Sequence, residues 1–261
     1  MLRTRIWTAL VALPTVLAIV VLAPPLLFSV FIGALGAWGL YEIGTVAGAR
    51  RPGQIAAVAV VGGVPLVAIL CGAETSWIAP AAVIVAMLGV VIRVAVKGPD
   101  GSQGRTARAV LGAIYVGGLF PFFARLRALD DGVRLIILMF LLVIATDTAA
   151  YFAGTYLGKL KLCPKVSPHK TVEGAVAGLA ACLVSGWILR PMLVPGWSRG
   201  DIALASLAIG VLAQLGDLAG SAYKRAAGVK DFGWLFPGHG GLLDRTCSLV
   251  FATAFTYYYA R

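Results

Sequence analysis

The segment from Tyr223 to Ser248, YKRAAGVKDFGWLFPGHGGLLDRTCS, gathers residue types that bind phosphate groups. Its cations suit a polyphosphate, and they are Lys224, Arg225, Lys230 and Arg245. Glycines beside His239, Gly240 and Gly241 among them, allow backbone N–H groups to approach an anion closely. We therefore expect an anion-binding loop here; an ordinary charged loop is the alternative.

Carboxylates accompany these cations at Asp217, Asp231 and Asp244. Mg²⁺ binds hard oxygen ligands and is usually held by one or two carboxylates plus substrate phosphates. Cations for phosphate and carboxylates for a metal ion are typical of a phosphoryl- or nucleotidyl-transfer site.

The elements that position these groups are predicted to be helices. A polar stripe with helical spacing (i, i+4, i+7, i+8) consists of Asp217, Ser221, Lys224 and Arg225. This stripe would aim one carboxylate and two cations at one cavity, although Asp217 at a helix end could instead reach interfacial water. Asp147 and Tyr151 lie one turn apart in another apolar stretch, where a polar contact between helices is the alternative.

Two further polar features are less specific. Glu42 lies within an apolar stretch, where a structural role is the simpler interpretation. The cluster Ser167–Glu173, SPHKTVE, predicts a helix start with Ser or Thr as the cap and Glu in the first turn. Such a helix start beside Lys165 and Lys170 would also suit an anion.

Composition identifies the environment of these residues. Apolar residues make up 60% of the chain and charged residues 13%, whereas a soluble domain is typically about a quarter charged. We expect an all-α, polytopic integral membrane protein forming a single membrane domain over 1–261. Nine transmembrane helices are predicted, at 6–22, 26–47, 55–71, 77–96, 109–124, 135–154, 172–189, 202–222 and 247–260. The first could alternatively be a signal peptide.

The distribution of basic residues predicts the orientation. With the N-terminus in the cytoplasm, most of the 22 Lys and Arg residues fall on the cytoplasmic side, together with segment 223–248. The net charge of +11 in so apolar a chain indicates membrane lipids or phosphate-bearing substrates as partners, and no nucleic acid. The four cysteines lack the spacing of a zinc site and are predicted to be free thiols.

The segment Ser221–Cys247 closely resembles the signature of phosphatidate cytidylyltransferases, S-x-x-K-R-x₄-K-D-x-G-x₂-[LIF]-P-x-H-G-G-x-x-D-R-x-D. Only the last fixed position differs, where Cys247 replaces aspartate. The segments DTAAYFAGTYLGK (147–159) and SPHKTVEG (167–174) resemble two weaker family motifs, the second with His169 and Val172 as departures. The resemblance is strong over 135–261, the expected catalytic half, and weak over the N-terminal helices at 1–130.

The resemblance implies a multi-pass enzyme of the bacterial inner membrane, a homodimer, with its active site on the cytoplasmic side. It would join CTP to phosphatidate, giving CDP-diacylglycerol and pyrophosphate. Asp217 and Asp244 would hold Mg²⁺, with a second monovalent or divalent cation left open. The other expected catalytic residues are Lys230, His239 and Arg245. The expected substrate-binding residues are Asp147, Lys170, Ser221, Lys224, Arg225, Asp231, Gly240 and Gly241.

Three alternatives stay open on the sequence. The acceptor could be another lipid phosphate, such as an isoprenoid-glycerol phosphate. The chain could be an ion-coupled transporter that uses Asp147 and Asp217, although no internal repeat supports this. Cys247 could mark an inactive scaffold, but Asp217 and Asp244 are both retained, which favours an active enzyme.

Overall fold

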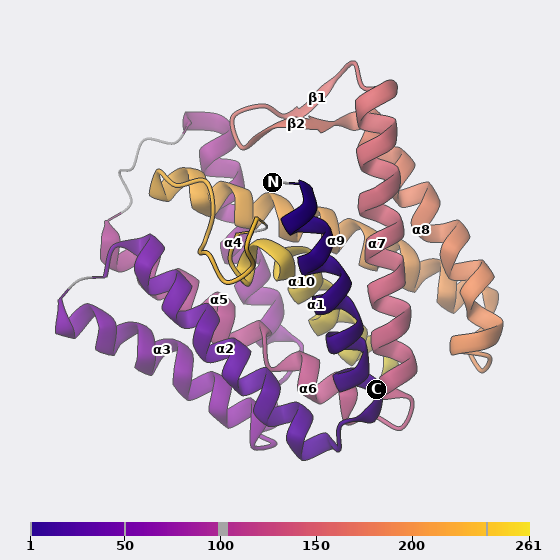
Figure 1. Ribbon diagram of the computed structural model, residues 1–261, viewed down its shortest axis with the longest axis horizontal. Helices are drawn as coiled ribbons and strands as arrows, with labels where there is room; N and C mark the ends of the chain where they lie inside the picture. The colour runs from indigo at the N-terminus through magenta and orange to yellow at the C-terminus, as the bar shows by residue number, and fades with distance from the viewer. Residues whose placement is uncertain (1, 50, 99–103, 239) are drawn as a thin grey trace.

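Helices make up almost all of the regular structure in the computed structural model, which describes residues 2–49, 51–98, 104–238 and 240–261 (Figure 1). The helices are α1 (Leu2–Leu22), α2 (Pro25–Ala47), α3 (Pro52–Leu70), α4 (Ile78–Lys97), α5 (Arg105–Leu119), α6 (Phe122–Arg127), α7 (Gly132–Tyr156), α8 (Val172–Leu193), α9 (Arg199–Ala227) and α10 (Leu243–Ala260). The two strands are β1 (Lys161–Cys163) and β2 (Ser167–Thr171). The predicted all-α class is therefore confirmed, with one small hairpin added.

Seven segments of the described chain are helices long and apolar enough to cross a membrane. They are α2, α3, α4, the stretch Arg105–Arg127, α7, α8 and α9. The expected spans at 6–22 and 247–260 are helical, as α1 and α10, but they are not among the seven. A polytopic membrane protein is thus supported, while the count of nine spans and the orientation of the N-terminus stay predictions.

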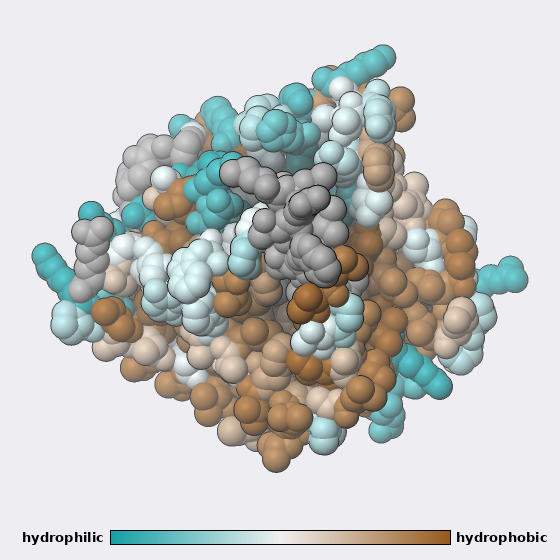
Figure 2. All heavy atoms as spheres, viewed as in Figure 1, coloured by the Kyte–Doolittle hydropathy of each residue, from teal (hydrophilic) through white to brown (hydrophobic). Residues whose placement is uncertain are grey.

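The surface is divided in the way that a membrane protein requires. Figure 2 shows hydrophobic residues over the lower part of the molecule and hydrophilic residues gathered at the top, over the β1–β2 hairpin of Figure 1. Many large apolar side chains of the spanning helices are exposed, among them Val60 on α3, Val85 on α4 and Ile188 on α8. Contact with lipid tails costs such side chains no free energy, whereas their exposure to water would be unfavourable.

Helix α10 is an interior helix. It packs against α5, α6, α7 and α9, and side chains along its length, such as Val250, Phe251 and Ala254, are buried. The same hydrophobic core includes residues from α2 and α3. Both halves of the chain therefore pack around α10, which begins within segment 223–248.

Helix α9 is longer than its predicted range of 202–222. Ser198 caps its first turn by accepting from the backbone N–H of Asp201, and the Asp201 side chain accepts from the Ser198 N–H. Gly228 ends the helix in the left-handed conformation, with a φ of 73° that glycine adopts at little cost. The extension places Lys224 and Arg225 in the last turn, where cations interact favourably with the helix dipole.

The β1–β2 hairpin was not predicted. Its strands are antiparallel, with Lys161 opposite Thr171 and Cys163 opposite Ser167. The expected helix start is confirmed at the end of the hairpin. Thr171 caps α8 by accepting from the Gly174 N–H, and Glu173 lies in the first turn. Residues 167–170 belong to the strand rather than to the helix start.

Candidate active site

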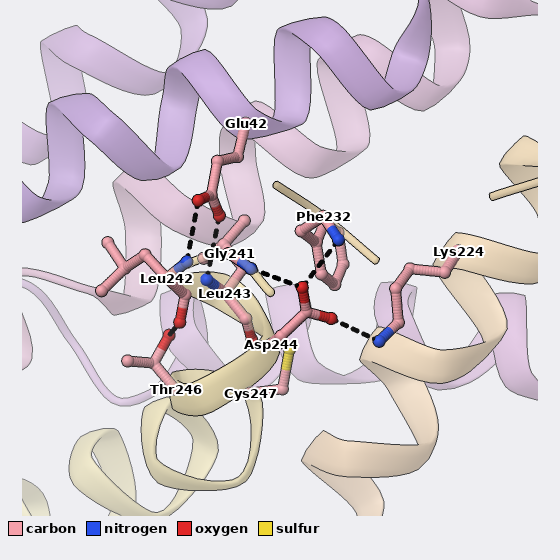
Figure 3. A network of polar contacts seen from close by, with 9 residues as sticks. All are labelled: Glu42, Lys224, Phe232, Gly241, Leu242, Leu243, Asp244, Thr246 and Cys247. Carbon is pink, nitrogen blue, oxygen red and sulfur yellow. Dashed lines mark hydrogen bonds and ion pairs between the residues drawn. The ribbon is translucent and has the colours of Figure 1, made fainter. Parts of the chain in front are cut away.

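Asp244 lies in the first turn of α10 and is held by three donors (Figure 3). Its Oδ2 accepts from the backbone N–H groups of Phe232, at 2.8 Å, and Gly241, at 2.9 Å. Its Oδ1 lies 2.5 Å from the Nζ of Lys224, which extends from the last turn of α9. The Asp244 side chain is only 2% exposed, so its charge is balanced by the protein rather than by water.

The loop between α9 and α10 is shaped around this carboxylate. Gly238 and Gly240 have φ of 78° and 85°, a region that favours glycine, and the Phe236 N–H donates to the Gly240 carbonyl. The Lys224 ammonium also lies 5.3 Å from the centre of the Phe232 ring, a cation–π contact. The Gly241 N–H that was expected to face a substrate anion faces Asp244 instead.

A second ion pair lies on the same face of α9 but is more open. The Nζ of Lys170, on β2, is 2.7 Å from Oδ2 of Asp217, and their side chains are 25% and 49% exposed. Asp147 on α7 is exposed and lies within electrostatic range of both. The hairpin therefore brings Lys170 to a carboxylate that is far from it in sequence.

The remaining predicted site residues lie near these two pairs in sequence and differ in their exposure. Ser221 and Arg225 are half-buried on α9, beside Asp217 and Lys224 in the predicted stripe. Lys230, Asp231 and Arg245 are exposed. His239 lies outside the described residues. Lys165, expected near the start of α8, instead donates to the carbonyl of Val96 at 2.6 Å.

Glu42 of α2 is the polar residue whose hydrogen-bond partners could not be predicted from the sequence. Its carboxylate is 1% exposed and accepts from the N–H groups of Leu242, at 2.7 Å, and Leu243, at 3.0 Å (Figure 3). The indole N–H of Trp38 donates to the same carboxylate at 3.0 Å. An acidic residue inside an apolar span was the signal, but the sequence named no partner for it.

A cavity of about 220 Å³ opens beside Glu42. Three of its lining residues, Trp38, Tyr41 and Thr45, share the α2 face that carries Glu42; Phe232, Gly233 and Trp234 of the loop complete it. The Trp38 and Trp234 rings pack edge to face, with their centroids 5.9 Å apart. The loop that holds Asp244 therefore also packs on α2.

Cys247, the departure from the family signature, is 4% exposed one turn after Asp244. Its Sγ donates to the carbonyl of Leu243 at 2.7 Å and packs against α9, where a Cβ added at Gly220 would lie 2.4 Å from it. The thiol therefore fills a small buried space between α9 and α10.

The Mg²⁺ ion that the family signature implies can be tested against these carboxylates. Asp217 fits, because half of its side chain is exposed and offers hard oxygen ligands beside cations. Asp244 fits only where Lys224 releases Oδ1, since three protein donors now occupy its oxygens. Within the described ranges no three His, Cys, Asp or Glu side chains form a metal cage, so substrate phosphates would supply the other ligands.

Fold and site together define a polytopic helical membrane protein with two carboxylate–lysine pairs, one between α9 and β2 and one between α9 and α10. The chain belongs to the cytidylyltransferase family, whose model matches residues 3–261. The family predicted from Ser221–Cys247 is therefore confirmed.

Individual relatives agree with this assignment. The chain is 31% identical over 284 residues to the phosphatidate cytidylyltransferase of Haemophilus influenzae, a match that covers 99% of this chain and 98% of that protein. It is 42% identical over 149 residues to the phosphatidate cytidylyltransferase of Bacillus subtilis, and 39% identical over 145 residues to that of Staphylococcus haemolyticus. These two matches each span about half of the relative, 55% of its length.

Proposed function

We propose that this protein transfers the cytidylyl group of CTP to phosphatidate, giving CDP-diacylglycerol and pyrophosphate. The observation that carries the proposal is the family match over nearly the whole chain, with relatives named phosphatidate cytidylyltransferase. The family match also favours this reaction over an ion-coupled transporter. The two carboxylate–lysine pairs support a site for phosphate groups and a metal ion.

The reaction forms one phosphorus–oxygen bond and breaks another. An oxygen of the phosphatidate phosphate attacks the α-phosphorus of CTP. The bond from that phosphorus to the oxygen bridging the β-phosphate breaks, and pyrophosphate leaves with the electron pair. Such a transfer depends mainly on positioning and on stabilisation of negative charge.

The residues of the site are assigned roles on this basis. The cations that neutralise and orient the two phosphate-bearing substrates are Lys170, Lys224, Arg225, Lys230 and Arg245, with His239 as a further donor. Asp217 and Asp244 would hold Mg²⁺, which when bound neutralises phosphate charge; a second cation is the open alternative. The substrate-binding set is completed by Asp147, Ser221, Asp231 and Gly240; the Gly241 N–H donates to Asp244, so Gly241 would act by shaping the loop.

The proposed site lies on the cytoplasmic side of a bacterial inner membrane, and the functional unit is a homodimer. The hydrophilic surface over the hairpin and the bias of basic residues support this side, because Lys and Arg collect in cytoplasmic loops. CTP would reach the site from the cytoplasm and phosphatidate from the bilayer.

The test uses the purified full chain in detergent with labelled CTP, Mg²⁺ and phosphatidate. A labelled CDP-lipid should form, and it should disappear when the metal is chelated or when Asp244 is replaced by alanine. Parallel reactions with other lipid phosphates, an isoprenoid-glycerol phosphate among them, identify the preferred acceptor. Absence of product with every lipid phosphate would overturn the proposal.

A further inference from the structure

We infer that Glu42 is a positioning residue, which fixes the start of α10 and thereby orients Asp244 in the active site. The inference deepens the proposed function and rests on it only for the role of Asp244. Glu42 itself reaches neither Asp244 nor the ion pairs in the described contacts. It would act through the backbone of residues 241–243, whose N–H groups donate to the carboxylates of Glu42 and Asp244.

The first step is the missing cap of α10. A helix begins with N–H groups that lack partners in the helix, and a capping side chain normally accepts from them. The residue at the cap position is Leu242, which makes no side-chain capping bond. Glu42 supplies the cap from α2, 200 positions earlier in the chain, with one carboxylate oxygen for each of two successive N–H groups.

The second step is the sharing of one short segment by two carboxylates. The Gly241 N–H donates to Asp244, whereas the next two N–H groups, of Leu242 and Leu243, donate to Glu42. Figure 3 shows both acids converging on this segment. A shift of the segment away from Glu42 would therefore also disturb the bonds that hold Asp244.

The third step is the close packing of the loop on Glu42. A Cβ added at Gly233 would lie 2.7 Å from Oε1 of Glu42, and one added at Gly241 would lie 2.5 Å from it. Both glycines adjoin residues in the Asp244 network, since Phe232 precedes Gly233 and Gly241 is itself a donor to Asp244. The carboxylate thus fixes the loop as well as the helix.

Glu42→Gln tests the inference because it keeps the shape but presents an NH₂ group to one of the two N–H donors. Misplacement of a catalytic group by about 1 Å can cost about 100-fold in rate. At a temperature where the variant is fully folded, we expect kcat to fall by about 10- to 100-fold. KM for CTP and for phosphatidate should stay within about 3-fold of the original.

The control is Leu66→Ala in α3. Leu66 is buried against Gly36 of α2, so its truncation destabilises the same region without touching the loop. Its kcat should stay unchanged below its unfolding transition. If Glu42→Gln instead loses activity only in proportion to its folded fraction, as Leu66→Ala would, the role is merely structural. A higher KM for CTP with unchanged kcat would make Glu42 a substrate contact through the adjoining cavity; either result overturns the inference.

Hydrogen exchange of the segment 231–246 gives a readout that does not depend on activity. Glu42→Gln should speed exchange of this segment, and Leu66→Ala should leave it unchanged. Glu42→Asp, which keeps the charge but withdraws the carboxylate by one methylene, serves if the glutamine variant does not fold, with the same expectation. Unchanged exchange would overturn the inference, whereas inactive wild-type protein with the expected exchange would overturn only the proposed function.

Discussion

The Nζ of Lys224 lies 2.5 Å from Oδ1 of Asp244, and this ion pair joins the end of α9 to the beginning of α10. Both side chains are largely buried, and the two backbone N–H groups on Oδ2 complete the network. Removal of one partner of a buried pair typically costs about 3–5 kcal/mol, because the other charge is left without compensation. A substitution that breaks this pair should therefore change both the unfolding free energy and the candidate active site.

Asp244→Asn should lower the unfolding free energy by about 3–5 kcal/mol and abolish product formation. The double variant Lys224→Met with Asp244→Asn should be more stable than Asp244→Asn alone, because no buried charge is then unpaired. Thermal unfolding of the purified proteins in detergent measures both effects. Strictly additive losses would show that the two side chains are not coupled.

Asp217→Asn should also lose activity, but unlike Asp244→Asn it should keep its stability. The Lys170–Asp217 pair is half-exposed, and such pairs contribute about 0–1 kcal/mol. The unfolding temperature should therefore stay close to that of the original protein, while the rate of CDP-lipid formation falls by at least about 100-fold if the carboxylate holds the metal ion. Unchanged turnover would exclude Asp217 from the site.

The C-terminal part of the site could be predicted from the sequence because its residues lie close together in the chain. Helical spacing places Asp217, Ser221 and Lys224 on one face, and α9 confirms that this stretch is helical. The link from Glu42 to Leu242 was beyond reach, since it joins residues 200 positions apart and no short-range pattern encodes it. The hairpin was missed for another reason: strands of three and five residues are too short for a clear alternation of apolar and polar side chains.

The transmembrane pattern was predictable for a similar physical reason. The helices that face lipid have long apolar runs, and seven of these satisfy the requirements for a span. α10 is different, because its first turn contains Asp244 and Arg245 and its apolar residues are buried inside the protein. Hydropathy alone cannot distinguish burial in protein from burial in lipid, so the span predicted at 247–260 stays a prediction.

Cys247→Asp should lower stability without raising turnover. The thiol is buried between α9 and α10, and the carboxylate would add both volume and a charge beside the main chain of Gly220. Overpacking alone costs about 1–3 kcal/mol. Cys247→Ser is the control, because a hydroxyl can keep the bond to the Leu243 carbonyl and adds no volume. A large gain in turnover for the aspartate variant would instead show that the cysteine impairs the site.

Gly216→Ala tests the close approach of α9 and α10 that brings Lys224 to Asp244. A Cβ at Gly216 would lie 2.3 Å from the Cys247 carbonyl oxygen, so the two helices would have to separate. We expect a loss of about 1–3 kcal/mol in stability, together with reduced CDP-lipid formation, because the ion pair spans the same interface. Gly89→Ala in α4 is the matched control: it has no atom within 4 Å of the added Cβ, and alanine there should stabilise the helix by up to about 1 kcal/mol. Equal effects of the two substitutions would show that helix propensity, rather than the spacing of α9 and α10, governs the result.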